Sequence, residues 1–237
     1  MKNFVEGDEI AAGYTIKNSQ FSLTWVIDRY LDLERSKTIP LPQAFILPSR
    51  YTDQYIAELN AKVIKMFQSI DLSNGFIFVQ CRINKRVFYV LEANYRTSAS
   101  CEYRLISKIN GINYMEMLVN YALRGEMESY DLNLDNPKFH KYDCMFPLAS
   151  NGGVVGKIIG LEHIKNKKSL ISIDQIYQIG DYIEKSGTLG QYFLRSLLIE
   201  NTIQELKNSI KEIQDTVRVL DDKGNDMLLP PFDTDRI

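Results

Sequence analysis

The 237-residue sequence has no marked excess of charge of either sign. It contains 28 Lys and Arg residues against 30 Asp and Glu residues, which gives a formal net charge of −2. Proteins dedicated to nucleic-acid binding normally show a basic excess or a basic stripe. The balance therefore argues against a nucleic-acid partner, although it leaves room for a local cationic site.

Cysteines and long apolar runs are also scarce. The three cysteines, Cys81, Cys101 and Cys144, form no CxxC pair, and their odd number favours reduced thiols over a disulfide framework. No apolar run approaches the roughly 18 residues of a membrane span. The N-terminus MKNFVEGDEI lacks the apolar core of a signal peptide. We therefore expect a cytoplasmic protein without a membrane partner.

The sequence does have ample material for a core, because hydrophobic residues make up 45% of it and include 14 Tyr and 11 Phe. Alternating apolar residues predict strands, and apolar residues spaced by three and four predict helices. The first part of the chain is predicted to hold strands at 9–18 and 21–31, an irregular extended connection at 38–51, a helix at 52–70, a hairpin at 75–96 and helices at 101–110 and 112–125.

From about residue 126 the sequence changes to polar turn formers and then to apolar stretches interrupted by glycine. These stretches predict a β-rich second part. Its last helix is predicted to start at Thr202, where Glu205 completes a capping box, and a strand at 216–221 and a loose tail at 228–237 follow. We therefore predict an α+β fold in two domains, residues 1–128 and a β-rich domain at 129–237.

Local signals also predict how two helices begin and end. Thr52 and Asp53 are the two candidate caps for the start of the helix at 52–70, and Gly125 is expected to end the helix at 112–125. The buried face of the helix at 52–70 is predicted from its apolar spacing to consist of Ile56, Leu59, Val63, Phe67 and Ile70.

The predicted hairpin GFIFVQCRINKRVFYVLEANYR carries polar residues that apolar strands do not need. Glu92 and Asn94 are two positions apart, so on a strand they point to one face. Their carboxylate and amide oxygens suit Mg²⁺, and Gln80 is a third oxygen donor on the partner strand. A two-residue turn at Asn84-Lys85 would put Gln80 and Glu92 on opposite faces. A reversal centred on Arg86 would set them directly opposite each other on the same face.

The sequence around these residues resembles the ATP-grasp enzymes, above all the ATP-binding halves of the carbamoyl phosphate synthetase large subunit. The resemblance lies in GFIFVQ, in YVLEANYR, in the twelve-residue step from Gln80 to Glu92 that joins them, and in LISKINGI. It departs at Tyr95, where the family has proline. The resemblance implies that Gln80, Glu92 and Asn94 bind two Mg²⁺ ions, with Glu92 bridging them. It also implies that Arg96, a cation suited to phosphate, contacts the phosphate or an acyl-phosphate intermediate.

The N-terminal stretch NFVEGDEIAAGYTI resembles the hinge segment of the same enzymes. The resemblance implies that ATP lies here, with the adenine edge meeting the backbone of four successive residues, Lys2, Asn3, Phe4 and Val5. It implies further that Glu9 binds the ribose hydroxyls.

The resemblance to ATP-grasp enzymes covers residues 2–125, and the β-rich part resembles the C-terminal region of carboxylate–amine and amino-acid ligases. It implies an ATP-dependent ligase in which ATP phosphorylates a small-molecule carboxylate and an amine then displaces the phosphate. The glycine-rich lid and phosphate-binding lysine of the family are not recognised in this sequence. We therefore expect the C-terminal part of an ATP-grasp enzyme, inactive in isolation, that uses a companion subunit or missing N-terminal half and could form homo-oligomers. The alternative is a non-catalytic or split subunit that binds a partner chain or nucleotide.

Overall fold

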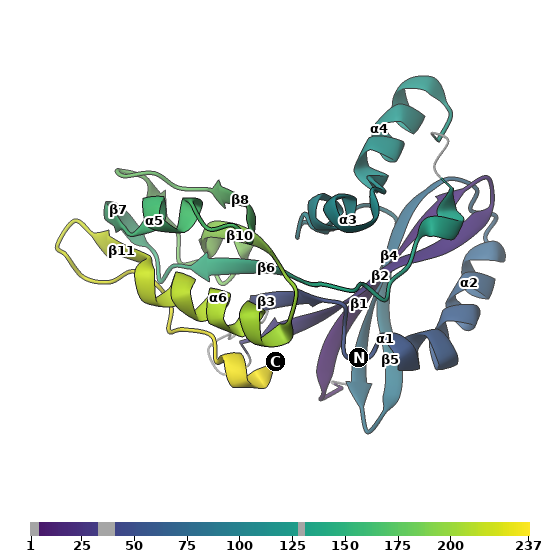
Figure 1. The fold of residues 1–237 in the computed structure, drawn as a ribbon, viewed down its shortest axis with the longest axis horizontal. Coiled ribbons are helices and arrows are strands. Elements are labelled where there is room, and N and C mark those ends of the chain that lie inside the picture. Colours follow the sequence, from purple (N-terminus) through teal and green to yellow (C-terminus); the bar gives the residue numbers. More distant parts are fainter. Residues whose placement is uncertain (1–4, 33–40, 128–130) are drawn as a thin grey trace. The chain divides into compact units, whose positions relative to one another are not determined.

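The computed structural model describes residues 5–32, 41–127 and 131–237, and it divides the chain into two compact units (Figure 1). The first unit comprises residues up to Arg29 together with Ile46–His140. The second comprises Tyr30–Phe45 together with Lys141–Ile237. The chain therefore passes between the units inside two of its strands as well as after His140. The predicted domain boundary, between residues 128 and 129, lies outside the described residues.

The fold is α+β, as predicted, and its strands form antiparallel pairs. In the first unit the strand order is β5-β4-β1-β2. These strands are β1 (Asp8–Lys17), β2 (Gln20–Leu31), β4 (Gly75–Asn84) and β5 (Val87–Asn94). The predicted turn between β1 and β2 is confirmed at Asn18 and Ser19. Both residues have positive φ angles, as a tight hairpin turn requires.

Helices cover both faces of this part of the sheet. They are α1 (Thr52–Tyr55), a π-helical turn (Ile56–Asn60), α2 (Ala61–Gln68), α3 (Glu102–Asn110) and α4 (Tyr114–Arg124), with a 3-10 turn at Leu132–Leu134. On one face, Val63 and Phe67 of α2 join the core that the strands build around Tyr14 and Val79. On the other face the Tyr114 ring of α4 stacks on Phe76, 4.1 Å between centroids.

The predicted helices are confirmed, with two differences at the first of them. Neither Thr52 nor Asp53 caps α1, because Tyr51 occupies the N-cap position and makes no side-chain capping bond. Ile70 is 61% exposed and lies outside the buried stripe to which it was assigned. Gly125 is the left-handed C-cap of α4, as its position predicted.

The second unit contains strands in the order β3-β6-β10-β8 and a three-stranded sheet in the order β11-β7-β9. Their bounds are β3 (Pro42–Leu47), β6 (Tyr142–Ala149), β7 (Gly153–Ile159), β8 (Leu170–Gln175), β9 (Tyr182–Ile183), β10 (Tyr192–Glu200) and β11 (Arg218–Asp221). The helices are α5 (Leu161–Lys165) and α6 (Ile203–Thr216), with 3-10 turns at Leu189–Gln191 and Thr234–Arg236. Thr202 and Glu205 form the predicted capping box at the start of α6.

Two expectations about irregular segments were wrong. The described part of the connection at 38–51 holds β3, whose Leu47 is fully buried, so it is a core strand despite its prolines. The tail is anchored rather than loose. The backbone N–H of Phe232 donates to Gln214 Oε1 over 2.6 Å, and its buried ring contacts the ring of Tyr30. Gln214 belongs to α6, so a long-range contact fixes a segment that has no regular local pattern.

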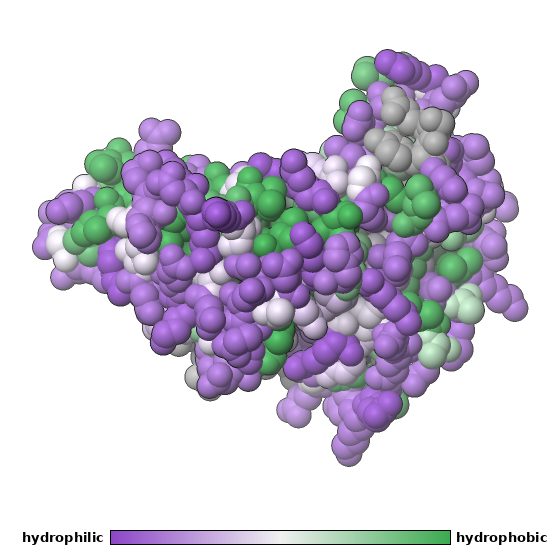
Figure 2. All heavy atoms as spheres, in the orientation of Figure 1, coloured by the Kyte–Doolittle hydropathy of each residue, from purple (hydrophilic) through white to green (hydrophobic). Residues whose placement is uncertain are grey.

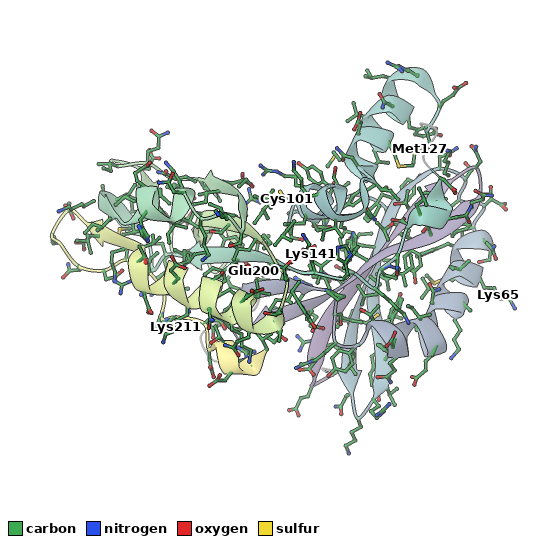
Figure 3. All side chains as sticks on the ribbon, in the orientation of Figure 1. Lys65, Cys101, Met127, Lys141, Glu200 and Lys211 are labelled. Carbon is green, nitrogen blue, oxygen red and sulfur yellow. The ribbon has the colours of Figure 1, made fainter. Side chains whose placement is uncertain are left out.

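The surface and the thiols agree with the composition. Figure 2 shows hydrophilic side chains over most of the visible face, with apolar residues gathered in patches. All three cysteines are free thiols; two are buried, and Cys101 lies at the N-cap of α3 (Figure 3). Across the described ranges, no helix has both the length and the apolar character that a membrane crossing needs.

Candidate functional site

The polar residues of the hairpin meet through a β-bulge. Lys85 and Arg86 form the turn, both with positive φ, and Asn84 pairs with Val87. A regular ladder from this turn would place Leu91 opposite Gln80. Instead the register shifts by one residue, and Gln80 pairs directly with Glu92.

This register confirms that Gln80 and Glu92 face the same way, directly opposite each other, as a reversal centred on Arg86 would place them. The turn itself, at Lys85 and Arg86, is neither of the two turns considered for the hairpin. Cys81 pairs with Val90 on one side of the shift, which leaves Leu91 as the extra residue. The bulge therefore shifts the pairing by one residue, and this shift brings the Gln80 amide and the Glu92 carboxylate to one face.

The three predicted metal ligands form one hydrogen-bonded cluster. Asn94 Nδ2 donates to Glu92 Oε1 over 3.1 Å. The Gln80 amide lies between Glu92 and Arg29. With its nitrogen toward Glu92 it donates to Oε1 over 2.8 Å, and its oxygen accepts from Arg29 Nη1 over 2.6 Å. The cluster offers one carboxylate and two amides. Among the described residues, no group of three or more His, Cys, Asp and Glu side chains is arranged to hold a metal.

Arg96 lies beside this cluster. Its guanidinium carbon is 5.2 Å from the centroid of the Phe78 ring, and Nη1 donates to the Thr97 carbonyl over 3.0 Å. Phe78 is the residue that pairs with Asn94 across the hairpin. The cation–π contact therefore holds the exposed Arg96 side chain next to the oxygen ligands.

Tyr95, which stands where the family has proline, has a partner of its own. Its hydroxyl donates to the carbonyl oxygen of Asn74, the residue before β4. The hydroxyl therefore ties the end of β5 to the start of β4. This contact gives the turn after Asn94 a fixed position without a proline ring.

Glu9 lies between two arginines on neighbouring strands. Glu9 pairs with Arg29 of β2 and with Arg82 of β4 in the two ladders of β1. Its Oε1 binds Arg29 Nη1, and its Oε2 is 3.0 Å from Arg82 Nη2. The Glu9 side chain is only 9% exposed. A ribose hydroxyl would therefore meet a carboxylate that is already oriented by two guanidinium groups.

The remaining hinge residues were predicted to meet adenine. Lys2, Asn3 and Phe4 lie outside the described residues. Val5 is half-buried just before β1. The role of these four residues stays a prediction.

Arg29 and Arg82 are the functional candidates that the sequence reasoning missed. Arg29 does not pair with its chain neighbour Asp28, because the two side chains lie on opposite faces of β2 and Arg29 binds Glu9 instead. Asp28 is buried on the opposite face, where Ser49 Oγ donates to it over 2.5 Å, and burial raises its pKa to about 6. The available signal was Arg82 itself, a cation two residues after Gln80 and therefore on the same face of a mostly apolar strand.

The segment after Arg96 is held by a buried acid. Ser98 Oγ and Ser100 Oγ each donate to Glu102 Oε2 over 2.7 Å, and Glu102 is 1% exposed. The left-handed Cys101 is the N-cap of α3 and makes no side-chain capping bond. The serine hydroxyls are therefore used to fix the loop between the site and α3.

No family model and no curated protein matches the chain. Solved structures do match. Phosphoribosylglycinamide synthetase from Anaerococcus prevotii is 17% identical with a TM-score of 0.77, over 92% of this chain and 54% of that one. L-amino acid ligase from Bacillus licheniformis is 16% identical with a TM-score of 0.77, over 92% and 53%. The biotin carboxylase domain of the Hydrogenobacter thermophilus 2-oxoglutarate carboxylase, in complex with MgADP, ADP and bicarbonate, is 11% identical with a TM-score of 0.68, over 93% and 46%.

These structures are ATP-grasp enzymes, and the chain has the ATP-grasp fold that its sequence resemblance predicted. The chain spans about half the length of the structures it matches. At these identities the likeness establishes the fold and leaves the chemistry to be argued from the residues.

Proposed function

We propose that this chain provides the metal-binding part of an ATP-dependent carboxylate–amine ligase that works through an acyl-phosphate intermediate. The observation that carries the proposal is the convergence of Gln80, Glu92 and Asn94 in one cluster beside Arg96. The matched phosphoribosylglycinamide synthetase and L-amino acid ligase support this kind of reaction for the fold.

The composition of the cluster suits magnesium. Mg²⁺ typically takes one or two carboxylates and fills its shell with water and phosphate oxygens. Glu92 supplies the carboxylate, and Gln80 and Asn94 supply amide oxygens. Two bound ions would offset the charge on the triphosphate during phosphoryl transfer.

The protein side chains supply orientation and charge. We assign Arg96 to the transferred phosphoryl group or the acyl phosphate, since a guanidinium matches the geometry of phosphate oxygens. The Phe78 ring restricts where Arg96 can lie. We assign Glu9 to the ribose and residues 2–5 to adenine, as the resemblance implies.

A second candidate is a non-catalytic subunit that binds a partner chain or a nucleotide. The observation that favours it is the low charge of the cluster, which combines one carboxylate with two amides. In this case the cluster would bind Mg²⁺ and nucleotide without turnover in any assembly.

Hydroxylamine trapping separates the two candidates. In the catalytically complete assembly, with this chain joined to or mixed with the polypeptide that supplies the rest of the ATP-grasp fold, ATP phosphorylates the carboxylate and releases ADP. Hydroxylamine then replaces the amine, attacks the acyl phosphate and gives a hydroxamate with release of phosphate. We expect hydroxamate that depends on ATP, Mg²⁺ and one carboxylate from a panel. Nucleotide binding without hydroxamate or phosphate release would favour the non-catalytic subunit.

A further inference from the structure

The Gln80 side chain is held between a cation and an anion, and this decides which way its amide points. Arg29 Nη1 lies 2.6 Å from one end of the amide, and Glu92 Oε1 lies 2.8 Å from the other. A guanidinium can only donate hydrogen bonds and a carboxylate can only accept them. The favourable orientation therefore turns the amide oxygen to Arg29 and the amide nitrogen to Glu92.

A metal shared by Gln80 and Glu92 requires the opposite orientation, because the amide oxygen is the ligand. The two oxygens would then be 2.8 Å apart. This agrees with the roughly 3 Å between neighbouring oxygens in an octahedral shell with Mg–O bonds of about 2.1 Å. The amide nitrogen, however, would then face Arg29 Nη1 at 2.6 Å, which places two donors together.

We propose that Arg29 is a positioning residue that sets the orientation of the Gln80 amide and so controls access of metal to the site. This inference rests on the proposed function. Without metal, Arg29 binds the amide oxygen and withholds it. When metal binds between Gln80 and Glu92, the amide turns and Arg29 keeps only its other contacts, including the one to Glu9.

Arg82 provides a matched comparison. Both arginines are mostly buried and bind the Glu9 carboxylate. The Arg82 side chain is 9% exposed and the Arg29 side chain is 17% exposed. Arg82 Nη1 also donates to the Gly7 carbonyl oxygen over 2.9 Å. Replacing either arginine removes one positive charge next to Glu9. The contact to the Gln80 amide comes from Arg29, whereas the second contact of Arg82 is to Gly7.

The test uses the 237-residue chain with Mn²⁺ alone as the probe, and free Mn²⁺ is measured by electron paramagnetic resonance. We expect Arg29→Met to bind Mn²⁺ about tenfold more tightly than the wild type, because it removes one charge-assisted hydrogen bond that competes with the metal. Arg82→Met should show only the smaller change that its charge produces. In a Gln80→Ala background the extra effect of Arg29→Met should disappear. Equal changes for the two variants, or an effect that persists without Gln80, would overturn the role of Arg29.

A readout on the unmodified chain covers the case in which a variant does not fold. By NMR, the Gln80 side-chain NH₂ protons should show contacts to the Glu92 side chain without metal, and saturating Mg²⁺ should move these contacts toward Arg29. Unchanged contacts would overturn the inference.

Arg29→Lys, which keeps a donor, should restore affinity toward that of the wild type.

The Glu92→Gln variant distinguishes a failure of this inference from a failure of the proposed function. Mn²⁺ binding that Glu92→Gln does not weaken, or no binding at all, would overturn the metal site and the role of Arg29 with it. If Mn²⁺ binding depends on Glu92 but changes equally in Arg29→Met and Arg82→Met, the metal site is supported and only the proposed role of Arg29 is overturned.

Discussion

Gln80 and Glu92 lie directly opposite each other on β4 and β5, although the Lys85-Arg86 turn by itself would pair Gln80 with Leu91. A one-residue bulge makes the difference, and bulges often re-aim side chains in this way. The candidate metal cluster therefore depends on a local irregularity in an edge strand, where an extra residue is easily accommodated.

Glu92→Gln keeps the shape of the side chain and removes its charge. In the catalytically complete assembly we expect ATP-dependent phosphate release to fall by about a hundredfold or more, the usual cost of losing one key electrostatic group. The control is Glu184→Gln, at an exposed residue of the second unit. Near-normal turnover of Glu92→Gln would show that Glu92 is only a solvated strand end.

The isolated 237-residue chain is expected neither to hydrolyse ATP nor to ligate, and to elute as a dimer or larger species. The three ligands carry one negative charge, so Mg²⁺ without phosphate should bind weakly. The edge strand β5 exposes Tyr89 (43%) and Val90 (47%), which favours association through its open edge. A phosphate-release assay tests the expected lack of ATP hydrolysis, and light scattering tests the expected dimer or larger species.

Charge placed on that edge provides the control. Tyr89→Lys should shift the chain toward monomer, whereas Val119→Lys, at a 50% exposed residue of α4, should not. A monodisperse wild-type monomer with steady ATP turnover would contradict the prediction.

Asp143→Asn should change how stability depends on pH. Asp143 is buried in β6 with no hydrogen-bond partner among the described residues, and burial raises its pKa to about 8. Because its folded pKa lies above its unfolded one, the wild type should lose stability relative to Asp143→Asn as pH rises from about 4 to about 8. The difference between the two unfolding free energies should change by about 1 kcal/mol per pH unit over this range. Asp143→Ala should show the same slope, since it also removes the titrating group. Urea unfolding at several pH values tests this, and parallel curves would contradict it.

Gly13→Ala should destabilise the first unit strongly. A Cβ at Gly13 would lie 2.3 Å from Trp25 Cε2 and 2.7 Å from Phe76 Cζ, and both rings are buried. Overpacking of this kind costs about 2 kcal/mol or more. Gly111→Ala is the control, because its Cβ would meet nothing within 4 Å and it carries only the cost of a positive φ, about 1 kcal/mol. An equal or smaller loss at Gly13 by urea unfolding would be inconsistent with the close packing.

Phe232→Ala tests whether the C-terminal segment belongs to the core of the second unit. Phe232 is 5% exposed, so we expect a loss of about 3 kcal/mol in the free energy of unfolding. Leu189→Ala, at a 46% exposed residue, should cost less than about 0.5 kcal/mol. A loss at Phe232 as small as the control would mean that the tail is loose after all.

The sequence by itself determined the features that depend on near neighbours. The capping box of Thr202 and Glu205 and the left-handed cap at Gly125 involve residues within a few positions of one another, so the local sequence specifies them. The alternation that puts Glu92 and Asn94 on one face is local in the same sense. The resemblance to ATP-grasp enzymes, which rests on such short segments, correctly predicted the fold.

Only the tertiary structure decided which residues meet across strands. The bulge at Leu91 lies in β5, and the alternation of apolar residues does not show which position a ladder will skip. Glu9 meets Arg29 and Arg82 because β1 lies between β2 and β4, and strand order is a property of the whole sheet. Phe232 is fixed by Gln214 of α6. Each of these contacts joins distant parts of the chain, and its formation depends on the packing of everything between them.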